Sequence, residues 1–175
     1  TVNFSEFDID QPKSMSDLFK GSINIIPSIP SIEKLPEELK HDKSYVYSGP
    51  LLLSDKDMLG PHFSEEVILS AEAFLEENRT KQIVYVDLGI WQPDVIVEKI
   101  EKCFNVLFDQ SNVVVLTNYV GYNCRNKEEE CRLFTSKFLP SNLICSKANL
   151  MIHKCGSGSY NHQINNQVPS IILGS

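Results

Sequence analysis

From Ser64 onward, short apolar runs alternate with longer amphipathic segments, and this alternation most limits the folds open to the chain. Residues 83–88 and 113–116 are almost wholly apolar and rich in β-branched side chains, which is typical of strands buried on both faces. Since helices must then cover both faces, the pattern predicts an α/β fold, with a Rossmann-like parallel sheet between two layers of helices.

The segments between these runs carry helix signals. Ser64 is a typical N-cap residue and is followed by two glutamates, and Pro93 and Asp94 open a second segment with apolar residues at helical spacing. Further on, we expect a charged connector over 122–132 whose acidic cluster, 128–130, is a solvated face. The later expected elements are a strand at 133–138, a short segment at 141–146, a strand at 150–152, a helix to about 166 and a strand at 170–173.

The first fifty residues differ in composition from the rest. They hold five of the nine prolines and only short apolar islands, with one expected strand at 45–47. We therefore expect a linker or inter-domain segment over 1–50 and a partial domain over 51–175. A domain of this type normally continues beyond its last strand, so the sequence also suggests a fragment.

Charge and cysteine usage exclude several classes of function. The chain has 175 residues and a net charge of −7 without a run of Lys or Arg, which argues against nucleic acid or an anionic membrane as partner. Neither a signal peptide nor a membrane-length apolar run is present, so we expect a cytoplasmic protein without membrane association. The five cysteines form no close CxxC pair, which favours free thiols and no metal site.

The stretch from Ile152 to Pro169 contains the main functional signal. An apolar run passes into a Gly/Ser-rich turn and then an expected helix, an arrangement that holds phosphates through free backbone N–H groups and the helix dipole. His153 and Lys154 add donors. The alternative is structural: a tight turn with Ser159 capping the helix, a backbone-satisfied His153 and a surface Lys154.

Several segments match one family pattern in order along the chain. They are 47–51 (YSGPL), similar to "vGPl"; 73–76 and 83–89 (AFLE, IVYVDLG), similar to "fLd…vvYvsfGS"; 138–144 (FLPSNLI), similar to "fvPQ..lL"; and 152–169, similar to "iHHGGaGt…al..GvP". Over roughly residues 45–175, the chain thereby resembles the C-terminal, nucleotide-sugar-binding half of two-domain GT-B glycosyltransferases, the UDP-glycosyltransferase family.

The resemblance implies binding of a nucleoside-diphosphate sugar, most often a UDP-sugar, as donor substrate, with no separate cofactor. It implies that the diphosphate lies against five residues of the turn: His153, Lys154, Gly156, Gly158 and Ser159. Further donor-pocket candidates are Gly89, Ile90, Pro140 and His162. No catalytic residue is expected in this chain, because the family's catalytic base belongs to an N-terminal acceptor domain that is absent here, so the fragment alone should be inactive.

Departures from the family pattern leave two alternatives open. The substitutions are Lys154 for a histidine, Cys155 and Gln167 for glycines, His162 for a glutamate and Ile90 for Ser or Thr. They are compatible with a diverged, non-catalytic domain that acts as a binding or scaffold module. An unrelated doubly wound nucleotide-binding domain is the other alternative. We expect His162 on the helix surface and Trp91, the only tryptophan, in core or inter-domain packing.

Overall fold

A computed structural model describes residues 21–50, 64–89 and 94–173. Ile90 and Trp91 lie outside these ranges. Internal contacts divide the chain into two units, residues 1–51 and 52–175, which are described separately below.

The first unit contains a small parallel sheet. Strand β1 (Asn24–Ile26) pairs with β2 (Tyr45–Tyr47), with a 3₁₀ turn, η3 (Glu37–Leu39), between them. The Tyr47 hydroxyl donates to the Glu33 carbonyl at 2.5 Å and accepts from the Leu35 backbone N–H at 3.0 Å, which ties the loop to β2. The described part of this unit contains no fully buried large apolar side chain, so it has little core of its own.

The second unit is built on a five-stranded parallel sheet. Its strands lie in the order β5-β4-β3-β6-β7 and its helices are α1 to α5. The strands are β3 (Gln82–Asp87), β4 (Val113–Thr117), β5 (Leu133–Thr135), β6 (Leu150–His153) and β7 (Ser170–Ile172). The helices are α1 (Glu65–Glu77), α2 (Asp94–Phe108), α3 (Lys127–Arg132), α4 (Ser141–Cys145) and α5 (Ser157–Asn165). The expected parallel α/β fold is confirmed.

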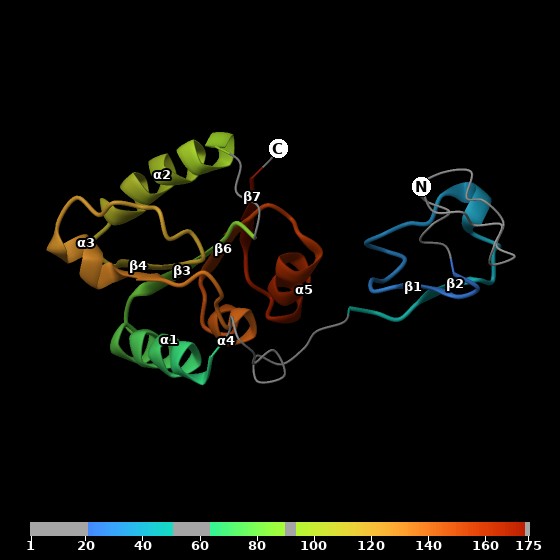
Figure 1. Ribbon diagram of the computed structural model, residues 1–175, viewed down its shortest axis with the longest axis horizontal. Coiled ribbons are helices and arrows are strands. Elements are labelled where there is room, and N and C mark those ends of the chain that lie inside the picture. The colour runs from blue at the N-terminus through green and yellow to red at the C-terminus, as the bar shows by residue number, and fades with distance from the viewer. Residues whose placement is uncertain (1–20, 51–63, 90–93, 174–175) are drawn as a thin grey trace, which may run out of the picture. The chain divides into compact units, whose positions relative to one another are not determined.

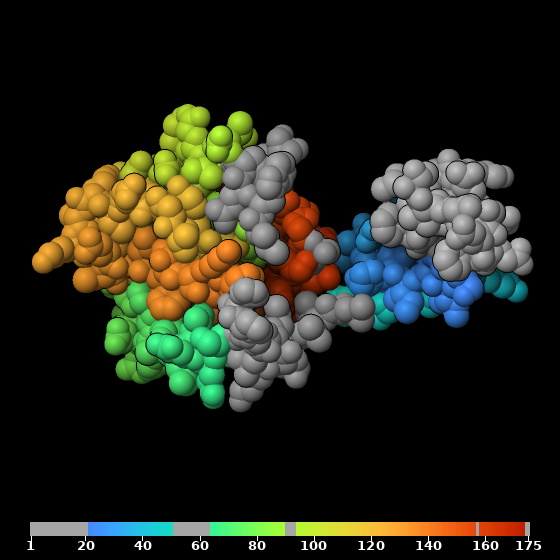
Figure 2. Space-filling view, in the orientation of Figure 1, coloured from blue at the N-terminus to red at the C-terminus, as the bar shows by residue number. Residues whose placement is uncertain are grey.

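Alternate residues of the central strands feed two cores, one on each face of the sheet. Val84 and Val86 pack with Ile100 and Phe104 of α2, whereas Tyr85 of the same strand packs on the opposite face in a cluster with residues of α1 and α4. Figures 1 and 2 show α1 and α2 on opposite sides of this unit. Strands buried on both faces in this way are almost wholly apolar, which explains the sequence pattern.

The structure corrects three expectations about local elements. Residues 122–132 are not only a connector, because α3 occupies the last six of them, and the Asn126 side chain caps it by accepting from the Glu129 N–H at 3.0 Å. The cluster 128–130 is not wholly solvated, since Glu129 is only 1% exposed and is paired with Arg125. Strand β5 ends at Thr135 rather than Phe138.

Two global expectations concern membranes and thiols. Over the described ranges, no helix has the length and apolar character needed to span a bilayer. All five cysteines are free thiols, as expected from their spacing.

The order in which strands are added to the sheet changes side at β3. From β3 it proceeds outward through β4 to β5, and then returns to form β6 on the other side of β3. Ligands of open parallel sheets bind outside the carboxyl ends of the strands at such a switch point. The ends of β3 and β6 are therefore the first place to look for a site.

Candidate functional site

Two polar side chains end the strands that flank the switch point. Asp87 is the last residue of β3 and His153 is the last residue of β6, and the two are direct partners in the parallel register. Each strand is otherwise nearly all apolar, so the change to polar residues occurs where the sheet ends. Because α5 follows β6, its start lies at this same carboxyl edge of the sheet.

The Asp87 carboxylate links three segments of this edge. Its Oδ1 accepts from the Gly89 backbone N–H at 2.9 Å and from the Asn118 side-chain amide at 2.8 Å. Its Oδ2 accepts from the Ser159 hydroxyl at 2.5 Å. One carboxylate thus connects the end of β3, the residue after β4 and the first turn of α5.

His153 is fully buried and carries a donor without a partner. Its Nδ1 accepts from the Cys155 backbone N–H at 3.2 Å, so in the neutral ring the proton lies on Nε2. That Nε2 is buried and finds no hydrogen-bond partner in the described part of the chain. Burial lowers the pKa of His153 below its usual value, while the nearby charge of Asp87 acts against this shift. The ring is therefore neutral at pH 7.

The turn between β6 and α5 is open to solvent. Cys155, Gly156 and Gly158 are exposed, and Lys154 is half-buried. A Cβ atom built on Gly158 would meet nothing within 4 Å, and one on Gly156 would meet only the Ser159 hydroxyl at 3.9 Å. The protein itself therefore leaves space beside the start of α5, as a ligand that approaches the backbone would require.

Cys155 adopts an unusual backbone conformation within this turn. Its φ is 62°, in the left-handed region that glycine adopts without steric cost. Gln167, at the other end of α5, has a φ of 54°. Both are positions at which the pattern that the sequence resembles has a glycine, and both have a backbone conformation that glycine adopts without steric cost.

The other sequence-predicted residues lie in different surroundings. Gly89 has a φ of 65° and belongs to the Asp87 network through its N–H, so it has both a conformational and a contact role. Pro140 is buried immediately before α4. His162 is 8% exposed, so the expectation of a helix-surface position was wrong; the side chain lies on the buried side of α5.

Sequence reasoning missed Asp87 and Asn118. The signal for Asp87 was present, because a carboxylate ends an apolar strand and a glycine follows two residues later. The signal for Asn118 was weaker, a single polar residue after Thr117. The sequence alone does not tell which strands are neighbours. Only the strand order, with β3 between β4 and β6, shows which polar residues at the strand ends meet.

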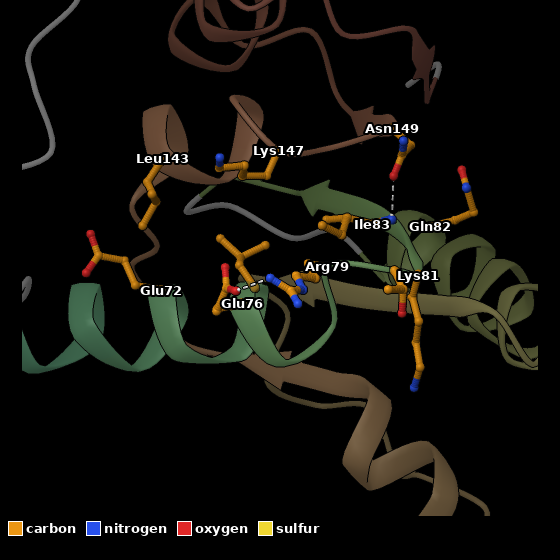
Figure 3. Close-up of a pocket in the computed structure, with 11 residues that line it drawn as sticks. Glu72, Glu76, Arg79, Lys81, Gln82, Ile83, Leu143, Lys147 and Asn149 are labelled. Atoms are coloured by element: carbon orange, nitrogen blue, oxygen red, sulfur yellow. Dashed lines mark hydrogen bonds and ion pairs between the residues drawn. The ribbon is translucent and has the colours of Figure 1, made fainter.

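A separate hollow lies at the opposite, amino-terminal edge of the sheet. It has a volume of about 660 Å³ and is lined by the end of α1, the start of β3 and the segment after α4. In Figure 3, Arg79 is paired with Glu76, and the Asn149 side chain accepts from the Ile83 backbone N–H. These two pairs of lining residues are thus engaged with each other. Among the described residues, no glycine turn and no unpartnered buried donor lies at this hollow.

Metal binding finds no support among the described ranges 21–50, 64–89 and 94–173. In those residues, no three His, Cys, Asp or Glu side chains gather closely enough to hold a metal ion. The carboxyl edge instead combines hydrogen-bond donors, an open helix start and one carboxylate.

Comparison with known proteins places the fold. No known protein family and no curated protein is matched by the sequence. Among solved structures, similarity extends to CalG4, the calicheamicin glycosyltransferase (TM-score 0.57, 14% identity, 97% of this chain and 39% of that chain). It extends also to the glycotransferase of kitacinnamycin (TM-score 0.61, 11% identity, 88% of this chain and 37% of that chain). A third similar structure is the spinosyn forosaminyltransferase SpnP (TM-score 0.54, 19% identity, 92% of this chain and 38% of that chain).

These comparisons establish a glycosyltransferase-like fold. The chain spans less than two fifths of the length of each of the three structures. The likeness therefore concerns one part of such a molecule.

Proposed function

We propose that this chain is the donor-binding part of a glycosyltransferase, which holds a nucleoside-diphosphate sugar, a UDP-sugar in the first instance, with its diphosphate at the start of α5. The observation that carries the proposal is the open turn at the switch point. Gly156 and Gly158 leave the backbone accessible, and the buried Nε2–H of His153, which precedes the turn, has no partner among the described residues. The glycosyltransferase-like fold supports the choice of a sugar donor over other phosphate ligands.

The chemistry of such a site is stabilisation of the leaving diphosphate. Negative charge develops on the diphosphate oxygens as the sugar is transferred, and N–H groups at a helix start are aimed at that charge without reorganisation. His153 would add its Nε2–H, and Lys154, beside the turn, would add a positive charge. The acceptor, and the base that activates it, would come from a part of the molecule beyond this chain.

A glycine substitution separates binding from folding. Gly158 is the second residue of α5 and has open space around it, so Gly158→Ala should raise the stability of the domain by about 0.5–1 kcal/mol through helix propensity. The methyl group that alanine adds would occupy the space into which a phosphate approaches. We expect calorimetry to show UDP and UDP-sugar binding by the wild-type chain and at least a tenfold loss in Gly158→Ala.

The matched control is Asn165→Ala, an exposed residue in the last turn of the same helix. It should also favour the helix but leave UDP binding unchanged. Absence of UDP and UDP-sugar binding by the folded wild-type chain would refute the proposal, and so would unchanged UDP binding in Gly158→Ala.

A non-catalytic, diverged module is the second candidate. The observation that favours it is the Asp87 carboxylate, which places negative charge beside the first turn of α5 through Ser159. In that case the domain would keep its fold but would bind UDP no better than inorganic pyrophosphate.

A further inference from the structure

The Asp87 carboxylate accepts a hydrogen bond from Ser159, in the first turn of the helix that we propose holds the diphosphate. We propose that Asp87 is an internal anion that competes with the diphosphate for the start of α5, and so sets the affinity of the site for anions. This inference rests on the function proposed above. It assigns to Asp87 a role in specificity rather than in catalysis.

The hydrogen bond to Ser159 makes the competition direct. Ser159 is the third residue of α5, and its hydroxyl has a single hydrogen, which it donates to Asp87 Oδ2 at 2.5 Å. The same hydrogen cannot also be donated to a phosphate oxygen. A bound diphosphate would therefore take Ser159 from Asp87 and leave the carboxylate beside it.

Charge repulsion adds to the exchange of hydrogen bonds. The start of a helix favours negative charge, and Asp87 already supplies one there. A second anion beside it is opposed by Coulomb repulsion, which the effective dielectric constant of a protein surface weakens but does not abolish. The site should therefore bind phosphates more weakly than its donors alone would allow.

A buried donor indicates that the edge is nevertheless built for a ligand. Within residues 21–50, 64–89 and 94–173, Nε2 of His153 has no hydrogen-bond partner, and leaving a buried N–H unsatisfied is costly. Asp87 does not satisfy it: the hydrogen bonds that its two oxygens accept come from Gly89, Asn118 and Ser159. An open turn and an unused donor thus lie beside a carboxylate that already holds the first turn of α5.

The substitution Asp87→Asn removes the charge and can keep every contact. The Gly89 backbone N–H and the Asn118 side-chain amide both donate to Oδ1, which an asparagine retains. Only Oδ2 becomes an amide, and the amide can donate to the Ser159 hydroxyl in place of accepting from it. The variant therefore isolates the charge. Asp87→Ser, a shorter polar side chain, serves as a second variant.

Asp109→Asn is the matched control. It removes the same charge from an exposed residue just after α2, at the opposite edge of the sheet. Thermal denaturation of each variant verifies that it is folded. Inorganic pyrophosphate is the probe, because it carries the diphosphate charge without a nucleoside.

We expect roughly tenfold tighter pyrophosphate binding in Asp87→Asn and Asp87→Ser than in the wild-type chain, and no gain in Asp109→Asn. Equal or weaker pyrophosphate binding in both folded Asp87 variants, including no binding at all, would overturn the inference. The proposed function fails separately: if the variants gain pyrophosphate affinity but neither they nor the wild-type chain bind UDP or UDP-sugars more tightly than pyrophosphate, the site is an anion site but not a donor site.

Discussion

Replacing Gln167 by glycine should stabilise the second unit. Gln167 follows the C-cap of α5 with a φ of 54°, and its N–H donates to the Ile164 carbonyl at 3.0 Å. The next N–H, of Val168, donates to the Gln163 carbonyl at 3.0 Å. This pair of bonds is the Schellman arrangement, in which glycine is the preferred residue at the left-handed position.

The magnitude follows from two opposing terms. A left-handed conformation costs a residue with a Cβ about 1–2 kcal/mol, whereas glycine loses about 0.5–1 kcal/mol more backbone entropy on folding. The Gln167 side chain is exposed, so little packing is lost. The net expectation for Gln167→Gly is a gain of about 0.5–1 kcal/mol in the free energy of unfolding, or about 2–5 °C in Tm.

Urea denaturation followed by circular dichroism measures the gain, and Gln167→Ala is the matched control. Alanine removes the same polar atoms but keeps the Cβ, so its stability should stay close to that of the wild-type chain. Cys155→Gly, at a φ of 62°, should give a similar gain, and the double variant should show the sum of the two. If Gln167→Gly is no more stable than Gln167→Ala, the left-handed conformation is not the source of the strain.

Three further predictions concern polar groups of the core. Burial alone would raise the pKa of Glu129, but hydrogen bonds from the backbone N–H and guanidinium of Arg125 lower it below its ordinary value. Its stabilisation is therefore complete above that ordinary value and is lost as the pH falls through the lowered one. Glu129→Gln should cost about 1–3 kcal/mol at pH 7, and progressively less in urea titrations as the pH falls below the ordinary value of 4.5. Tyr85→Phe removes a buried hydroxyl that lies 2.8 Å from Ser141 Oγ, and should cost about 1 kcal/mol; Ser141→Ala in the same background should then add little, and full additivity in thermal melts would contradict the contact. Arg132→Met should cost about 2–4 kcal/mol, because the guanidinium donates to the carbonyls of Phe108, the last residue of α2, and of Gln110; a loss below 1 kcal/mol would show that water replaces it.

The fold could be predicted from the sequence where the chain is regular. Strands β3 and β4 are continuous apolar runs, and the structure has each within one residue of the expected bounds. Helices α1 and α2 have apolar residues at helical spacing and begin where their start signals predict. Helix α3 was missed because its six residues are almost all charged, although Asn126 before it and the glutamates of its first turn are helix-start signals. The burial of Glu129 depends on its contacts with Arg125, and the spacing of apolar residues in the sequence does not predict such contacts.

The candidate site was predicted only in part. The strand, turn and helix over 150–165 were expected, and the structure has them at the switch point of the sheet. Asp87 comes 72 positions before Ser159 in the chain, so their hydrogen bond follows from strand order and not from local pattern. His162 was assigned to the wrong side of α5 because that helix has few apolar residues to define its buried face.

The central claim is that the start of α5, at the carboxyl edge of the sheet, binds a nucleoside diphosphate. A titration of the ¹⁵N-labelled chain with UDP, followed by the backbone amide resonances, tests it most directly. We expect saturable shifts of the Gly156, Gly158 and Ser159 amides, with smaller changes at Gly89. No shift at these amides at millimolar UDP, or shifts confined to Lys81 and Lys147 at the opposite hollow, would contradict the account.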